Sequence, residues 1–203
     1  GLQNTHHISR IQVHPRDPEV AYVAAVGHLW GSNMERGVYK TTDGGQNWER
    51  VLFVDEHTGA IDLVMDPNDP MTLFAAMYQR QRRTWGFNGG GPGSGIYRTV
   101  DGGSSWTELT DGLPQGDKGR IGLDVYRRDG NVVCALVEAD ARTQGQARGG
   151  GGKNQLAAEA GVGPGGGQVG EHHHLLASLA TDIELVVCED GVVGHRIASA
   201  DSA

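Results

Sequence analysis

One stretch of fifteen residues occurs twice in this chain, at 37–51 and at 95–109, and it constrains the fold more than any other feature. Both copies contain Thr-x-Asp-Gly-Gly-x-x-Trp, and their aspartates, Asp43 and Asp101, are 58 residues apart. Asp-Gly is a strong hairpin signal, because glycine tolerates the positive φ of a tight turn. The aspartate side chain can also accept backbone N–H bonds within its own turn. Each copy therefore predicts a strand, a tight turn and a second strand, with the tryptophan packing over the turn.

A second element repeats ahead of each hairpin. Residues 11–18 (Ile-Gln-Val-His-Pro-Arg-Asp-Pro) match residues 63–70 (Leu-Val-Met-Asp-Pro-Asn-Asp-Pro), and both predict an apolar strand that ends in a proline-bounded turn. Another short apolar segment follows each of them, at 20–26 and at 72–78. A third copy of this element runs over 120–137. The chain is therefore built from repeats rather than from one irregular domain.

One complete unit contains four short antiparallel strands and has a period of about 50–60 residues, which is typical of a β-propeller blade. We predict an all-β fold, a fragment of a β-propeller. Two four-stranded blades are expected at about 8–54 and 60–109, and a partial third blade near Gly119 should supply only its first two strands. Isolated blades leave open sheet edges and an exposed flank, so we expect marginal stability or self-association.

The repeat pattern stops near Asp140, in the middle of the third unit. A run of glycines follows at 149–152, and no Trp, Tyr or Phe occurs after Tyr126. Such a segment cannot bury enough apolar area to offset the entropy of ordering it. We therefore divide the chain into a propeller fragment, 1–140, and a Gly-rich low-complexity tail, 141–203.

Within this tail we expect residues 141–180 to be disordered and residues 183–193 to form a hairpin about an Asp-Gly turn. The abrupt loss of period and of aromatic residues leads to the hypothesis that the tail is frame-shifted or foreign. The first residue is Gly1 rather than Met, and we interpret the chain as a fragment or a processed product.

Composition and charge exclude several functions. The formal net charge is -8, so nucleic acid is not an expected partner. The two cysteines form neither a disulfide framework nor a metal-binding spacing, and the histidine runs at 6–7 and 172–174 lack Cys or carboxylate partners at zinc spacing. We therefore expect no metal and no other cofactor. No apolar run of about 18 residues exists, so no membrane span is expected.

The paired Thr-x-Asp-Gly-Gly-x-x-Trp motif resembles the Asp-box, also called the bacterial neuraminidase (BNR) repeat. This repeat recurs in sialidases, xyloglucanase-type glycosidases, photosystem assembly factors and sortilin-like receptors. The surrounding segments at 26–31, 36–48, 58–67 and 85–95 together resemble the N-terminal propeller of bacterial sortilin-like proteins, which are often named glycosyl hydrolases because of the Asp-box alone. The resemblance covers about residues 5–140 and implies a secreted or periplasmic protein.

The resemblance also implies that the Asp-box residues are structural. Asp43 and Asp101 are a tempting catalytic pair, because a glycosidase needs two carboxyls about 5–9.5 Å apart. However, they occupy equivalent turns of successive blades, which should place them on the outer rim and a blade apart. We therefore expect no catalytic residue, and we expect structural roles for Asp43, Gly44, Trp48, Asp101, Gly102 and Trp106.

The loops between the second and third strands are the candidate binding region. They span 27–36 in blade one and a longer stretch, 79–94, in blade two. Loops on a rigid repeat scaffold commonly bind ligands, and equivalent loops emerge on one face. Aromatic and guanidinium groups suit a ligand or peptide contact surface. The candidate ligand-binding residues are His28, Trp30, Arg82, Arg83 and Trp85. In the alternative, the arginines are a solvated basic loop and the tryptophans cover the ends of the blade core.

Three functions remain open at this point. The favoured one is a non-catalytic, sortilin-like scaffold that binds peptide, protein or carbohydrate ligands and joins the remaining blades of a larger propeller. The alternative is a fragment of a glycoside hydrolase of the sialidase or xyloglucanase type, which is the expected class if the chain is an enzyme. Sialidase chemistry requires arginines that converge from separate blades, whereas Arg80, Arg82 and Arg83 lie on one loop. The third is a purely structural edge piece of an assembly.

Overall fold

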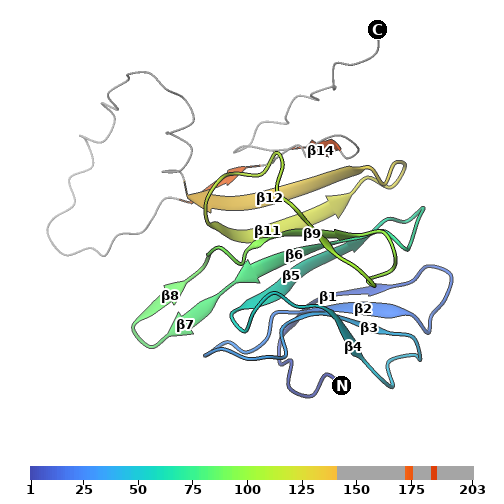
Figure 1. Ribbon diagram of the computed structural model, residues 1–203, viewed down its shortest axis with the longest axis horizontal. Coiled ribbons are helices and arrows are strands. Elements are labelled where there is room, and N and C mark those ends of the chain that lie inside the picture. Colours follow the sequence, from blue (N-terminus) through green and yellow to red (C-terminus); the bar gives the residue numbers. More distant parts are fainter. Residues whose placement is uncertain (141–171, 176–183, 187–203) are drawn as a thin grey trace, which may run out of the picture.

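The computed structural model describes residues 1–140, 172–175 and 184–186. Regular structure in these residues is entirely β, which confirms the all-β prediction. Three small sheets are stacked face to face, and a two-stranded hairpin projects from one end of the stack (Figure 1). No helix in the described ranges is long and apolar enough to cross a membrane.

The first two sheets have the strand order of propeller blades. Blade one contains β1 (Ile8–Val13), β2 (Ala21–Ala25), β3 (Gly37–Thr41) and β4 (Glu49–Leu52) in sequential antiparallel order. Blade two contains β5 (Thr58–Met65), β6 (Leu73–Gln79), β9 (Gly95–Thr99) and β10 (Thr107–Leu109) in the equivalent order. Both four-stranded blades are thus confirmed.

The third sheet differs from its prediction. Its first two strands, β11 (Lys118–Val125) and β12 (Val132–Asp140), form the expected antiparallel pair. In addition, β13 (His172–Leu175) pairs antiparallel with β12, so the expectation of a two-stranded third blade is wrong, and the stretch 141–180 contains a strand. β14 (Glu184–Val186) also pairs with β12, in parallel. The rest of the tail lies outside the described residues, and the domain boundary after 140 stays a prediction.

The core lies between the blades, and blade two buries both of its faces against its two neighbours. Strand β6 shows how alternation achieves this. Leu73, Ala75 and Met77 face blade one in a cluster with Tyr22 and other residues of that blade. The intervening residues of β6 face blade three in a second cluster. Blade two is therefore packed between blade one and blade three.

A buried carboxylate also connects all three blades near their first strands. Asp62 Oδ1 lies 2.8 Å from Nε of Arg10 in blade one. Asp62 Oδ2 accepts a hydrogen bond of 2.9 Å from the backbone N–H of Leu123 in blade three. Asp62 thus joins the first strands of all three blades.

Candidate functional site

The Asp-Gly-Gly turn of blade one is held by its own side chains. Thr41 Oγ1 donates to Asp43 Oδ1 at 2.8 Å, and the backbone N–H of Gly45 donates to the same threonine hydroxyl at 2.9 Å. Asn47 donates to both carboxylate oxygens, through its backbone N–H at 2.9 Å and through its amide Nδ2 at 2.7 Å. Gly44 and Gly45 have φ values of 67° and 90°, which only glycine adopts readily.

The turn of blade two repeats this network. Thr99 Oγ1 donates to Asp101 Oδ1 at 2.7 Å. Ser105 donates to Asp101 Oδ1 through its backbone N–H at 2.9 Å and to Asp101 Oδ2 through its hydroxyl at 2.6 Å. The tryptophans differ, because Trp48 Nε1 donates to the Gly45 carbonyl at 3.0 Å, whereas Trp106 Nε1 is buried with no hydrogen-bond partner in the structure.

These networks make both carboxylates stable anions. Hydrogen bonds from Asn47 and Thr41 lower the pKa of Asp43 from 3.8 to about 2. Hydrogen bonds from Ser105 and Thr99 hold the pKa of Asp101 further below its usual range. A glycosidase general acid needs the opposite shift, a raised pKa. Both carboxylates are therefore hydrogen-bond acceptors within their own turns and do not have the raised pKa of a general acid.

The loop between β2 and β3 is organised by one buried arginine. Arg36 is fully buried and is the largest side chain in the interior. Its guanidinium donates to the backbone carbonyls of Val26, His28 and Gly31. Burial lowers the pKa of Arg36, and the nearby charge of Arg80 lowers it further. Arg36 thus fastens both ends of the loop that carries Trp30.

The longer loop of blade two folds into a hairpin that the sequence reasoning missed. It consists of β7 (Gln81–Arg83) and β8 (Gly86–Asn88), and it extends beyond the end of the sheets (Figure 1). The connecting residues are Thr84 and Trp85, which lack the Asn-Gly or Asp-Gly signal of a tight hairpin turn. The return of the loop to β9 is held by Gly93, whose N–H donates to Gln79 Oε1 at 2.9 Å.

Arg82 connects the two loops. It forms an isolated bridge with Trp30 and is paired in register with Phe87. Its guanidinium carbon lies 5.9 Å from the ring centroid of each of these aromatic residues. Trp30, Arg82, Trp85 and Phe87 are all exposed. We call these four residues the loop-end surface.

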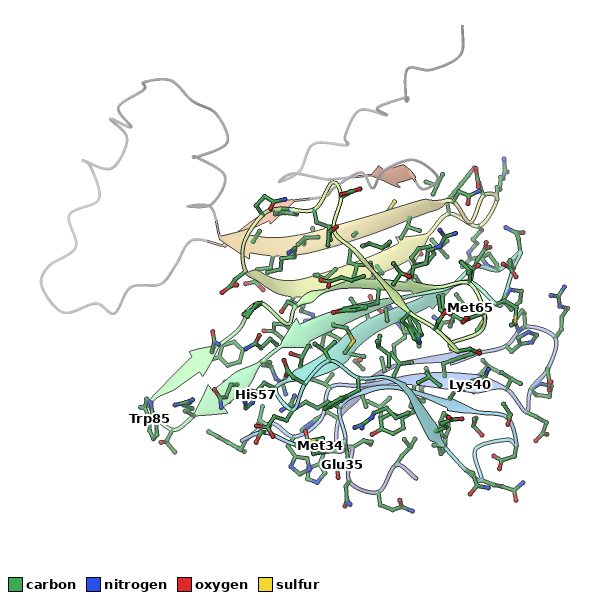
Figure 2. All side chains as sticks on the ribbon, viewed as in Figure 1. Met34, Glu35, Lys40, His57, Met65 and Trp85 are labelled. Atoms are coloured by element: carbon green, nitrogen blue, oxygen red, sulfur yellow. The ribbon has the colours of Figure 1, made fainter. Side chains whose placement is uncertain are left out.

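The other predicted residues lie in different surroundings. Trp85 is at the tip of the hairpin and projects outward, with 81% of its surface exposed (Figure 2). Trp30 is 52% exposed, so neither ring covers the end of a blade core. His28 stacks on His6 with ring centroids 3.8 Å apart, and its ring Nε2 lies 3.1 Å from the Asn4 carbonyl. Arg83 is exposed and donates to Gln81 Oε1 on its own strand.

Two residues of this region were absent from the predicted site. Phe87 was overlooked as a contact residue, although alternation along the hairpin would place it opposite Arg82 once β7 and β8 are recognised. Arg36 had a weaker signal. It immediately precedes the repeated strand, at the position where blade two has Ser94. Nothing in the local sequence indicates that this arginine is buried.

Part of the chain is similar in sequence to a known protein. No family model matches the chain. The chain is 30% identical over 152 residues to a probable oligoxyloglucan-reducing end-specific xyloglucanase of Neosartorya fischeri, an alignment that covers 66% of this chain and 17% of the relative. The chain thus spans less than a fifth of that relative's length.

Among solved structures, an ancestral GH74 enzyme aligns with a TM-score of 0.49 and 15% identity, covering 66% of this chain and 16% of that one. A GH74 xyloglucanase from Xanthomonas campestris aligns with a TM-score of 0.45 and 19% identity, covering 65% of this chain and 20% of that one. By its own strand order, the described part of the chain is a β-propeller fragment of two complete blades and one incomplete blade.

Proposed function

We propose that this chain is part of a propeller-type glycoside hydrolase of the xyloglucanase kind, and that its loop-end surface binds a neutral glucan chain. The similarity to a xyloglucanase sequence favours this alternative over the sortilin-like scaffold. The observation that carries the proposal is the exposure of Trp30, Trp85 and Phe87 on adjacent loops, with Arg82 beside the first and last of these rings. Extended apolar rings on a surface commonly mark a binding site.

The chemistry of a glucan suits such a surface. A pyranose ring has an apolar face that packs on an aromatic ring, and its hydroxyls accept hydrogen bonds from a guanidinium. Arg82 lies between Trp30 and Phe87, so one guanidinium is placed to serve sugars bound on either ring. The anchoring by Arg36 keeps the Trp30 loop in place before ligand arrives, which reduces the entropy cost of binding.

In this proposal the chain contributes binding rather than the complete catalytic machinery. A glycosidase needs two carboxyls facing one bond, one of them with a raised pKa. Asp43 and Asp101 are committed to their own turns and have lowered pKa values. Hydrolysis is therefore expected to depend on carboxylates beyond those of the two Asp-Gly-Gly turns.

Titration with xyloglucan oligosaccharides, followed by tryptophan fluorescence and calorimetry, tests the proposal. We expect Trp30→Ala and Phe87→Ala each to weaken binding about tenfold, the equivalent of roughly 1.4 kcal/mol per lost stacking contact. Trp30→Tyr keeps an aromatic face and should retain most of the affinity. Tyr126→Ala is a matched control, because Tyr126 is an exposed aromatic residue on blade three, outside the loop-end surface.

The result that contradicts the proposal is equal affinity of the wild type and both alanine variants for the oligosaccharide. Absence of any binding to xyloglucan, together with binding of an acidic peptide that depends on Arg82 and Arg83, would favour the scaffold function instead. A glycosidase assay on the same samples separates binding from turnover.

A further inference from the structure

Two pairs of adjacent arginines lie in turns on the described part of the chain. Arg82 and Arg83 end strand β7, and Arg127 and Arg128 lie between β11 and β12. All four residues are exposed. A protease that recognises paired arginines therefore meets two candidate sites, and the stability of the surrounding backbone decides between them.

The hairpin of Arg82 and Arg83 is held mainly by its own two strands. β7 and β8 pair with each other over three residues and form a sheet that is separate from the blades. Five of the six strand residues are exposed, and Trp85 projects from the turn (Figure 2). A bridge between Arg82 and Trp30 connects the hairpin to blade one. Isolated two-stranded hairpins are marginally stable in water, so we expect this one to open locally while the blades stay folded.

The two ends of the hairpin are fixed to the blades. On one side, the backbone N–H of Arg80 donates to the His57 carbonyl at 3.2 Å. On the other side, the backbone N–H of Gly91 donates to the Lys118 carbonyl of blade three at 3.1 Å. Opening is therefore confined to residues 81–90, a stretch long enough to enter a protease cleft as an extended strand.

The turn that contains Arg127 and Arg128 lacks this freedom. It joins β11 and β12, whose buried residues belong to the core between blades two and three. The backbone N–H of Tyr126 donates to the Val132 carbonyl at 2.8 Å and closes the turn. Asn68 of blade two also donates to the Arg127 carbonyl at 3.1 Å. Presenting this pair as an extended strand would require two packed blades to separate.

Within the hairpin, Arg83 is the arginine that is freer to enter a specificity pocket. The guanidinium carbon of Arg82 lies 5.9 Å from the ring centroids of Trp30 and Phe87. Arg83 instead donates to Gln81 Oε1, an exposed contact within its own strand. A contact of this kind costs little to exchange for a carboxylate of a protease.

We propose that the peptide bond between Arg83 and Thr84 is a processing site for an endopeptidase that recognises paired arginines through carboxylates in its first two specificity pockets. Arg83 enters the first pocket and Arg82 the second, because carboxylates form strong paired hydrogen bonds with guanidinium groups. Hydrolysis adds one water molecule across this bond and leaves a carboxylate on Arg83 and an amine on Thr84. The two pieces stay together, because β6 and β9 remain paired from Leu73 to Met77.

Cleavage at this bond also divides the loop-end surface. Trp30 and Arg82 lie before the cut, and Trp85 and Phe87 lie after it. Processing should therefore weaken glucan binding. This consequence rests on the proposed function, whereas the cleavage itself does not.

Digestion of the folded full chain with a kexin-type endopeptidase, followed by mass spectrometry over time, tests the proposal. We expect the bond after Arg83 to be cut at least about tenfold faster than the bond after Arg128. Arg83→Gln should slow the cut after residue 83 at least about a hundredfold, because a carboxylate pocket then lacks its partner. Arg128→Gln is the matched control and should leave the rate after Arg83 unchanged.

A second variant separates local opening from exposure. Thr84→Asn combined with Trp85→Gly supplies the Asn-Gly pair that favours a tight hairpin turn, and it keeps both arginines. This variant should be cut about tenfold more slowly than the wild type, since its hairpin opens less often. An equally fast cut in this variant, faster cleavage after Arg128, or a wild-type chain that stays intact at Arg83 would overturn the proposal.

Size-exclusion chromatography and circular dichroism of the cut chain complete the test. We expect both pieces to elute together with the blade structure retained, and their separation would also overturn the proposal. Calorimetry with xyloglucan oligosaccharides then compares the cut and intact chains. Because cleavage is read from fragment masses and binding from heat, failure of the processing proposal is distinguishable from failure of the glucan-binding one.

Discussion

Blades one and two contain the same Asp-Gly-Gly turn, but they hold the neighbouring loop in different ways. In both turns the threonine hydroxyl donates to the carboxylate, and the residue four positions after the aspartate donates to it through its backbone N–H at 2.9 Å. That residue is Asn47 in blade one and Ser105 in blade two, and the side chain of each also donates to the second carboxylate oxygen. The turn is a local structure that fifteen residues specify.

The loops before the third strands lack this local solution. Blade one inserts Arg36 into the interior, where it donates to three carbonyls at the start and in the first half of its loop. Blade two has Ser94 at that position, and its hydroxyl accepts a 2.9 Å hydrogen bond from the backbone N–H of Gln79. The comparison shows that both blades share the hydrogen bonds within the Asp-Gly-Gly hairpin. The loops before the third strands differ, because the side chains that anchor them bond to residues outside that hairpin.

The largest expected difference between the blades is the change in the free energy of unfolding when Arg36 or Ser94 is replaced by alanine. Arg36→Ala should lower the free energy of unfolding by about 3–5 kcal/mol, because it leaves a cavity and removes the donors of buried carbonyls. Ser94→Ala should cost only about 1–2 kcal/mol, since one N–H loses its acceptor. Urea denaturation monitored by circular dichroism measures both.

Arg36→Lys serves as the control for the Arg36 prediction. It keeps the charge but loses the planar fork that reaches separate carbonyls, so it should lie between the wild type and the alanine variant. Equal stability of the Arg36→Ala and Ser94→Ala variants would show that the two anchors are equivalent, and the comparison between the loops would fail.

Sequence reasoning predicted the local features well and the distant ones poorly. The repeat at 37–51 and 95–109 was sufficient for two complete blades, because strand alternation and the Asp-Gly turn are both encoded within the hairpin. The equivalence of the two blades also predicted that the loops of Trp30 and Arg82 emerge at the same end of the sheets. It missed the β7–β8 hairpin, which lacks a typical turn pair, and β13, whose pairing partner β12 precedes it by more than thirty residues.

Site details depended on contacts between segments that the sequence separates. The burial of Arg36 depends on carbonyls five to ten residues upstream, and Trp30 pairs with a hairpin that belongs to the next blade. Residue type alone favours burial for tryptophan and exposure for arginine. The structure reverses both at this site, because the arginine finds buried acceptors and the tryptophan lies on a loop tip.

A smaller difference separates Lys40 of blade one from its blade-two counterpart, Arg98. Lys40 Nζ donates to the Gly102 carbonyl of the next blade at 2.8 Å. Arg98 Nε is buried and makes no hydrogen bond within the described residues, and the guanidinium carbon lies 5.8 Å from the Phe74 ring centroid of its own blade. Lys40→Met should therefore lower the free energy of unfolding by about 1–2 kcal/mol, whereas Arg98→Met should change it by less than about 0.5 kcal/mol. Thermal unfolding followed by circular dichroism at pH 7 compares the two.

Tyr22→Phe tests the same contact from a neutral donor, because the Tyr22 hydroxyl also donates to Gly102. Its cost should be smaller than that of Lys40→Met, since a hydrogen bond from a charged donor is the stronger one. An Arg98→Met variant as destabilised as Lys40→Met would mean that blade two has an equivalent polar contact with its neighbour.

The smallest effect distinguishes the two turns by their response to acid. The pKa of Asp43 is lowered from 3.8 to about 2 by Asn47 and Thr41, and the pKa of Asp101 lies further below its usual range because of Ser105 and Thr99. A carboxylate with a lowered pKa in the folded state contributes stability above its unfolded pKa and loses it as the pH falls through the folded one. Stability from Asp43 should therefore be constant above about pH 5 and decline between about pH 4 and pH 2.

Asp43→Asn and Asp101→Asn variants sharpen this difference, because an amide cannot titrate. Each variant should be less stable than the wild type at neutral pH and should have a flatter stability profile below pH 4, with the larger change for Asp101→Asn, whose folded pKa is shifted further. Chemical denaturation at half-unit pH steps from 2 to 7 provides these profiles. If the Asp43→Asn profile falls with acid as steeply as the wild-type profile, the carboxylate of that turn is not the group that acid protonates. The hydrogen bonds from Asn47 would then have to be attributed to turn geometry alone.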